Sequence, residues 1–211
     1  MRVLPVGSLL FLWLLPLAAQ QTPDAPSASS KSGAHRKAPD PGSVTNGLYR
    51  NSWFGFTYKI PLGWVERTEQ MQDDSTDPAK SLALLAVFSR PPEFSQEGLN
   101  SGVVIVAESA ASYPGMKQAA DYLDAITQLT TAKGFEVVSD AYEFSVGATK
   151  LARVDYEKQK GATNALQTTL ALHAKSYFVS FTFIAGSEEE MDGLIAGLQF
   201  ASAGARSSHP K

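Results

Sequence analysis

The segment that decides the fold reads NSWFGFTYKIPLGW and spans residues 51–64. Its apolar side chains recur at every second position, which is typical of a strand with one buried face. These side chains belong to Phe54, Phe56, Tyr58 and Ile60. The following Pro61-Leu62-Gly63 predicts a turn, after which Trp64 begins a second strand. The segment therefore predicts a strand–turn–strand unit at the start of a sheet.

Outward from this unit, the hydrophobic pattern predicts more strands and two helices. The predicted strands cover residues 64–68, 81–89, 102–107, 135–138, 142–146, 150–158, 165–173 and 177–185. A three- and four-residue spacing of apolar side chains over residues 116–129 predicts an amphipathic helix, with Pro114 near its start and Gly134 just past its end. A second helix is expected to start at the capping box Ser187 to Glu190 and to run through Leu198, with Phe200 extending its apolar stripe. This order, with tight turns, predicts an α+β fold on a central antiparallel sheet.

The composition divides the chain into four segments. Residues 1–20 resemble a signal peptide, because Arg2 precedes an apolar run over residues 9–19 and a small-residue cleavage site. Cleavage after Ser27 is an alternative, and an uncleaved segment would hold the chain at the membrane. Residues 21–42 are rich in Pro, Ala, Ser and Lys and predict a disordered linker. Residues 43–201 are expected to form a single domain, and residues 202–211 a disordered tail.

The charge and cysteine content exclude several classes of function. The chain has 18 Lys and Arg, 21 Asp and Glu and no Cys. Loss of residues 1–20 would remove only Arg2, so the exported chain would carry a formal charge of −4. An acidic chain lacks the basic face that nucleic acid requires, so we expect no nucleic-acid partner. The absence of Cys excludes disulfides, thiolate metal sites and a lipid-bearing cysteine.

The opening segment also carries a family resemblance. The stretch GFTYKIPLGW, residues 55–64, resembles the "GFxxxxPxGW" opening of PsbP-like domains. The closing strand over residues 177–185 with its capped C-terminal helix is similar too. This superfamily includes the fungal Ran-binding Mog proteins and bacterial DcrB-like proteins. The resemblance implies an α/β/α sandwich with a central antiparallel sheet and an accessory or protein-binding role. It assigns no ligand or catalytic residue.

Three sets of residues are candidates for catalysis. His173 is the one histidine inside the predicted domain, and a satisfied histidine at a strand end is the preferred interpretation. Asp155 with Glu157, or Glu66 with Glu108, would suit glycoside cleavage if their carboxylates lay close together. The sequence has no Gly-x-Ser-x-Gly elbow, Walker loop or dinucleotide-binding glycine motif.

A calcium site is the alternative in the region after residue 70. Asp73, Asp74 and Asp77 offer the hard oxygen ligands that calcium prefers. Their spacing is not that of an EF-hand loop, and no glycine supplies its sharp turn. We therefore interpret residues 71–80 as a solvated acidic loop, with calcium binding as an open alternative.

Together these patterns predict an exported, non-enzymatic accessory or protein-binding module with a partner in the cell envelope and no cofactor or metal. Trp53 has the opposite strand parity to Phe54 and is the first candidate for partner binding. Phe94, in the predicted loop over residues 90–101, is the second. The alternatives are an exported hydrolase with an unrecognised carboxylate or histidine site, and a calcium-binding module.

Overall fold

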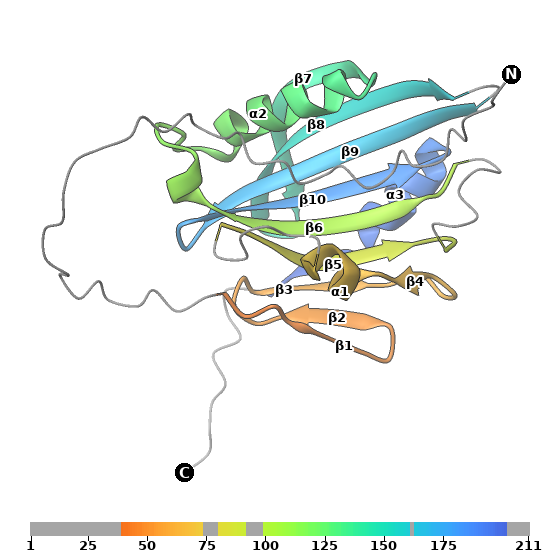
Figure 1. Ribbon diagram of the computed structural model, residues 1–211, viewed down its shortest axis with the longest axis horizontal. Helices are drawn as coiled ribbons and strands as arrows, with labels where there is room; N and C mark the ends of the chain where they lie inside the picture. Colours follow the sequence, from red (N-terminus) through yellow and green to blue (C-terminus); the bar gives the residue numbers. More distant parts are fainter. Residues whose placement is uncertain (1–38, 74–79, 92–98, 161–162, 202–211) are drawn as a thin grey trace, which may run out of the picture. The chain divides into compact units, whose positions relative to one another are not determined.

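A computed structural model of the chain describes residues 39–73, 80–91, 99–160 and 163–201 (Figure 1). The predicted signal peptide, nearly all of the predicted linker, the predicted tail and Phe94 lie outside these ranges. The residues from Asp40 onward belong to one compact unit.

A seven-stranded sheet forms most of this unit, and every pair of neighbouring strands is antiparallel. Its strands, in spatial order, are β4 (Val65–Glu66), β5 (Ser81–Phe88), β6 (Gly102–Ser109), β10 (Tyr177–Ala185), β9 (Thr163–Ala174), β8 (Thr149–Lys160) and β7 (Glu136–Val146). The sequential hairpin strands β7 to β10 are neighbours, as expected for short connections.

A smaller, four-stranded sheet is built around the opening segment. It has the order β1 (Ser43–Thr45), β2 (Leu48–Asn51), β3 (Phe56–Lys59) and β11 (Leu198–Phe200). Phe56 pairs with Asn51 on one side and with Phe200 on the other. Gly55 precedes the strand with a φ of +76°, a conformation that favours glycine. The chain therefore turns just before the strand.

The helices lie on both sides of the large sheet (Figure 1). The helix α2 (Ala119–Ala132) packs on β7, β8 and β9, and its Tyr122 and Leu123 are buried with Phe178. The helix α3 (Glu188–Ala196) packs on β9 and β10 and joins the core formed by Val179 and Phe181. Phe178 and Val179 are successive residues of one strand, so α2 and α3 cover opposite faces. The predicted α+β class with antiparallel sheets is confirmed.

The larger hydrophobic core joins the two sheets through aromatic side chains. The ring of Phe56 lies edge-on to that of Phe181, with centroids 5.0 Å apart. Tyr58 is fully buried beside Phe183, with ring centroids 6.2 Å apart. Phe54 and Ile60 are half-buried against the same core. The predicted buried face of the opening segment is therefore present, although the strand itself begins at Phe56 rather than Phe54.

The predicted second strand over residues 64–68 is wrong in its extent. Only Val65 and Glu66 pair with β5, and a short helix, α1 (Thr68–Asp73), follows. The Thr68 hydroxyl donates to Glu66 at 3.0 Å and accepts the Ala86 backbone N–H at 3.1 Å. This side chain replaces a ladder bond and ends the strand. Asp73 consequently ends a helix rather than lying in the predicted loop.

The predicted helix with its apolar stripe over residues 116–129 begins later than expected, at Ala119, and ends as predicted just before Gly134. Its N-cap is Gln118, and the Asp121 carboxylate accepts the backbone N–H groups of Lys117 and Gln118 at 2.9 and 3.0 Å. These bonds lower the pKa of Asp121. The reciprocal capping of Gln118 and Asp121 sets the start of α2, a signal that the apolar spacing alone does not contain.

Two further predictions, for residues 135–146 and for residues 198–200, are wrong. The predicted strands over residues 135–138 and 142–146 are one strand, β7, whose register shifts twice between Val137 and Tyr142. Such bulges bend a strand without ending it. Leu198 and Phe200 belong to β11 and not to the last helix, because Gly197 ends α3 and Leu198 then pairs with Tyr58.

At the start of the last helix, one of the two predicted capping hydrogen bonds is present. Ser187 accepts the Glu190 backbone N–H at 3.2 Å, which is the expected N-cap. The Glu190 carboxylate accepts the N–H of Gly186 at 2.8 Å, one residue before the position that a capping box would use.

We predict that Leu198→Ala lowers the free energy of unfolding by about 2–5 kcal/mol, because it leaves a cavity in the main core. Leu198 is 2% exposed and joins the two sheets through β11. Leu62→Ala is the matched control, since Leu62 is fully exposed at the turn, and should change stability by less than about 0.5 kcal/mol. Urea unfolding measures both variants. Equal effects would contradict the burial of Leu198 in the main core.

We also predict that stability falls steeply at high pH. Burial raises the pKa of Tyr49, Tyr58, Tyr113, Tyr122, Tyr142 and Tyr156 above 10.0. The neutral phenols stabilise the fold below pH 10.0, and this contribution is lost as the pH rises through the raised pKa values. Burial lowers the pKa of Lys133 from 10.5 to about 8. Between these two pH values the free energy of unfolding therefore gains a contribution from Lys133 as the pH rises, which opposes the effect of the phenols. Urea unfolding at several pH values above 10.5 should show a falling midpoint; a constant midpoint would contradict the burial of the phenols.

Candidate functional site

A hollow of about 300 Å³ opens between the end of β7 and the end of α3. Its walls are Phe144, Ser145 and Val146 of β7, Asp192, Ile195 and Ala196 of α3, Leu198 of β11, and Arg153 of β8. Most of these side chains are apolar, and Phe144 and Val146 are only half-buried against the core. The hollow is therefore a largely apolar surface feature with one cationic residue, Arg153, and one acidic residue, Asp192, in its wall.

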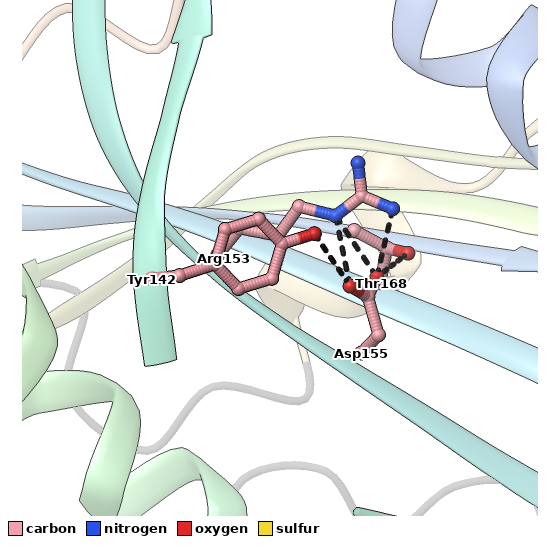
Figure 2. Close-up of polar contacts among 4 residues, drawn as sticks. All are labelled: Tyr142, Arg153, Asp155 and Thr168. Atoms are coloured by element: carbon pink, nitrogen blue, oxygen red, sulfur yellow. Dashed lines mark hydrogen bonds and ion pairs between the residues drawn. The ribbon is translucent and has the colours of Figure 1, made fainter. Parts of the chain in front are cut away.

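Arg153 is held at the hollow by Asp155, two residues along the same strand. Its Nε lies 2.9 and 3.0 Å from the two Asp155 carboxylate oxygens, and one terminal nitrogen lies 2.9 Å from Oδ1. The other terminal nitrogen points away from the carboxylate (Figure 2). The guanidinium carbon also lies 4.8 Å from the centroid of the Phe144 ring and 5.8 Å from that of Tyr142. The arginine side chain is thus fixed by charge and by aromatic contact.

The Asp155 carboxylate ties three strands together. Besides Arg153 of β8, it accepts the Tyr142 hydroxyl of β7 at 2.9 Å and the Thr168 hydroxyl of β9 at 2.6 Å (Figure 2). Burial, together with the bond to this carboxylate, raises the pKa of Tyr142. Both carboxylate oxygens accept bonds from protein donors, so this group is poorly suited to act as a general base.

The two predicted carboxylate pairs are not catalytic dyads. Glu157 is exposed and lies opposite Glu136, whereas Asp155 is committed to its three partners. Glu66 pairs with Val87 and Glu108 with Ser81, which places them at opposite ends of β5. Six strand residues separate these positions by roughly 20 Å, at about 3.3 Å a residue, beyond the reach of a glycosidase pair.

Glu108 has a structural environment that the sequence did not reveal. Its Oε2 accepts the Tyr113 hydroxyl at 2.8 Å and the Tyr122 hydroxyl at 2.5 Å. The Tyr122 ring stacks on Phe178 with centroids 4.9 Å apart. Glu108 therefore anchors α2 and the segment before it to the sheet. Tyr113 and Tyr122 follow Glu108 by 5 and 14 residues and lie outside its strand, so the periodicity of one element does not link the three groups.

His173 lies at the exposed end of β9. Its ring centroid is 4.7 Å from that of Phe178, and Nδ1 lies 3.2 Å from the Lys117 carbonyl oxygen. These contacts agree with the interpretation of a satisfied histidine at a strand end. The other two histidines, His35 and His209, lie outside the described residues.

Trp53 is half-buried in the turn that precedes β3. Its ring lies beneath Lys175 of the β9–β10 hairpin, with the ammonium 4.9 Å from the ring centroid. Its Nε1 is buried and has no hydrogen-bond partner among the residues that the structure covers. Phe54 and Tyr177 contact each other beside it, with ring centroids 5.9 Å apart. The structure thus brings Trp53 to one end of the large sheet, and the position of Phe94 lies outside the described ranges.

The predicted calcium loop is described only at Asp73, which is exposed at the end of α1; Asp74 and Asp77 lie outside the described residues. No group of three or more His, Asp or Glu suited to a metal ion occurs within those ranges. No helix in the described part of the chain is both long and apolar enough to cross a membrane.

No protein-family model matches the chain, and no curated protein matches its sequence. Solved structures that are similar include the solution structure of a cyanobacterial PsbP from Synechocystis, at 12% identity and a TM-score of 0.47, covering 76% of this chain and 96% of that one. LpqN, involved in cell envelope biogenesis of Mycobacterium tuberculosis, is 13% identical with a TM-score of 0.42, covering 77% and 87%.

A crystal structure from Bacteroides thetaiotaomicron is 17% identical with a TM-score of 0.36 and 74% of this chain covered. The match spans about half of that protein, 48% of its length. One of these solved structures is a PsbP, and the opening segment of this chain resembles that of PsbP-like domains. At such identities they add nothing about function, and membership of the family remains a prediction.

We predict that Asp155→Asn lowers the free energy of unfolding by about 2 kcal/mol. It removes the charge that compensates Arg153, and the loss is smaller than for a fully buried pair because some solvent screening remains. The side chains of Arg153 and Asp155 are 16% and 20% exposed. Urea unfolding measures the change.

The control for this prediction is Glu143→Gln, which breaks the exposed ion pair between Lys150 and Glu143. Their side chains are 71% and 62% exposed, so the expected change is below about 0.5 kcal/mol. An Asp155→Asn variant as stable as this control would show that the carboxylate does not stabilise the three strands.

Proposed function

We propose that this chain is an exported, non-enzymatic module that binds a protein partner of the cell envelope. The observation that carries the proposal is the open hollow at the end of β7 and α3, whose volume of about 300 Å³ lies at the lower end of the range for binding pockets. The predicted signal peptide supports export, and the resemblance to PsbP-like domains implies an accessory or binding role.

The arrangement of the charged groups supports binding rather than catalysis. Asp155 is occupied by Tyr142, Arg153 and Thr168, and Glu108 by Tyr113 and Tyr122. Each of these carboxylates links separate elements of the fold. Their bonds stabilise the scaffold on which a rigid binding surface rests.

Two surfaces are proposed to contact the partner. One is the hollow, and the other is the end of the large sheet where Trp53 lies beneath Lys175. Trp53 is half-buried, so only part of its ring is available to a partner. Aromatic and arginine side chains contribute most often to the energy of protein interfaces, and each surface holds one or more.

Site-specific photocrosslinking in the native cells tests this function. A photoreactive residue replaces Ala196 at the hollow, Ser52 beside Trp53, or Asp124 on the exposed face of α2 as a control. We expect a protein adduct from position 196 or 52, identified by mass spectrometry, and none from position 124. Adducts from none of the three positions would contradict a partner-binding role.

The same preparation tests export. The intact mass of the protein recovered outside the cytoplasm should correspond to loss of residues 1–20, or of residues 1–27 under the alternative cleavage. A full-length mass would instead indicate an uncleaved segment that holds the chain at the membrane.

A further inference from the structure

The two elements that form most of the wall of the hollow, β7 and α3, carry acidic and no basic side chains. The strand β7 carries Glu136, Asp140 and Glu143, and the helix α3 carries Glu188, Glu189, Glu190 and Asp192. Neither element contains a Lys or Arg. Arg153, the one cationic residue in the lining, has its charge compensated by Asp155. Glu143 is paired with Lys150, so among the described residues the uncompensated negative charge in the lining is that of Asp192, and the three acids of the first turn of α3 lie on the same helix; a positively charged occupant complements this charge.

The shape of the site favours an extended occupant. The strand β7 is an edge of the large sheet, so within the described residues no strand pairs with its outer side. Its bulged part, between Val137 and Tyr142, is unsuited to pairing, as is common for protected edges. The part from Tyr142 to Val146 keeps a regular register with β8. This regular part is the one that borders the hollow, and it can add a further strand.

Side chains on one face of this regular part lead into the hollow. Tyr142, Phe144 and Val146 alternate along the strand and therefore share a face. Tyr142 is 42% exposed, and the other two line or adjoin the core. A strand added beside β7 would place an apolar side chain next to Phe144 and Val146, facing Ile195 and Ala196 of α3.

The chain's own basic segments do not fit this description. Residues 31–37 and 202–211 are basic, but they contain no Val, Leu, Ile, Met or aromatic residue. Such segments would satisfy the charge of the walls and leave the apolar hollow empty. The occupant thus combines basic residues with a large apolar side chain, a combination that these two segments do not supply.

We infer that the groove between β7 and α3 binds an extended segment of a partner protein with an apolar residue flanked by Lys or Arg. The apolar side chain enters the hollow, the backbone pairs with Tyr142 to Val146, and the basic side chains lie against Asp192 and its acidic neighbours. This inference rests on the proposed function and names the chemistry of its partner.

The test measures binding of labelled peptides to the exported chain by fluorescence polarisation. One set has Val, Leu, Ile or Phe at the centre, flanked by Lys and Arg. A second set has the same centres flanked by Glu and Asp, and a third has Gly and Ser centres with the basic flanks. We expect only the first set to bind, and added salt to weaken its binding because it screens the charges.

Two variants with matched controls locate the binding. Ala196→Arg fills the hollow and should weaken binding at least about tenfold, a change of 1.4 kcal/mol. Ala132→Arg, at an exposed position of α2, should leave it unchanged. Asp192→Lys should weaken binding severalfold, whereas Asp124→Lys should not. Melting temperatures show whether each variant is folded. If Ala196→Arg does not fold, the comparison of Asp192→Lys with Asp124→Lys tests whether the peptide binds at the groove.

Several results would overturn the assignment: no binding by the first set, equal binding by the acidic set, or binding unaffected by Ala196→Arg and Asp192→Lys. A tenfold gain in affinity on deletion of residues 202–211 would show that the tail occupies the groove and would also overturn it. Crosslinking distinguishes failure of the groove assignment from failure of the proposed partner-binding function. A partner captured from position 52 while the peptides fail removes the groove assignment but leaves the binding function in place.

Discussion

The contact between Phe56 and Phe181 joins the two sheets of this protein, and the main core is arranged around it. Phe56 belongs to the small sheet and Phe181 to the large one, and their rings meet edge to face at 5.0 Å. Phe200 of β11 contacts both rings, with centroids 6.0 and 5.9 Å away. Aromatic side chains bury large areas, so this cluster provides much of the driving force that holds the sheets together. With no cysteine in the chain, stability depends on such packing.

The position of β11 connects this core to the surface. After α3 ends at Gly197, Leu198 pairs with Tyr58 of β3 and is buried in the core, while also lining the hollow. A Cβ at Gly197 would lie 3.0 Å from the Lys59 carbonyl oxygen, so the close approach of helix end and strand suits glycine. The packing that joins the two sheets therefore also forms the wall of the proposed binding groove.

Buried and half-buried polar groups form a second set of constraints. The sheet carries carboxylates at Glu108 and Asp155, on opposite faces, and each accepts hydrogen bonds from side chains of other elements. Partly buried charges are costly unless they are paired, which explains why both are surrounded by donors. Because these bonds link α2 to β6 and β7 to β9, they define how the outer elements sit on the sheet.

The sequence by itself determined the elements whose signals are local. Alternating aromatics in residues 54–60, the apolar runs of the central strands and the Ser187 cap predicted most strands, the last helix start and the α+β class. The boundaries at Thr68 and Leu198 depended on partners distant in the chain, Ala86 and Tyr58, and were therefore misplaced, whereas the start of α2 depends on the local capping of Gln118 and Asp121, which the apolar spacing does not report. The tertiary structure alone brought Tyr142, Arg153, Asp155 and Thr168 together and formed the hollow beside them. Strand register and the packing of α3 control those distances, and neither leaves a local pattern in the sequence.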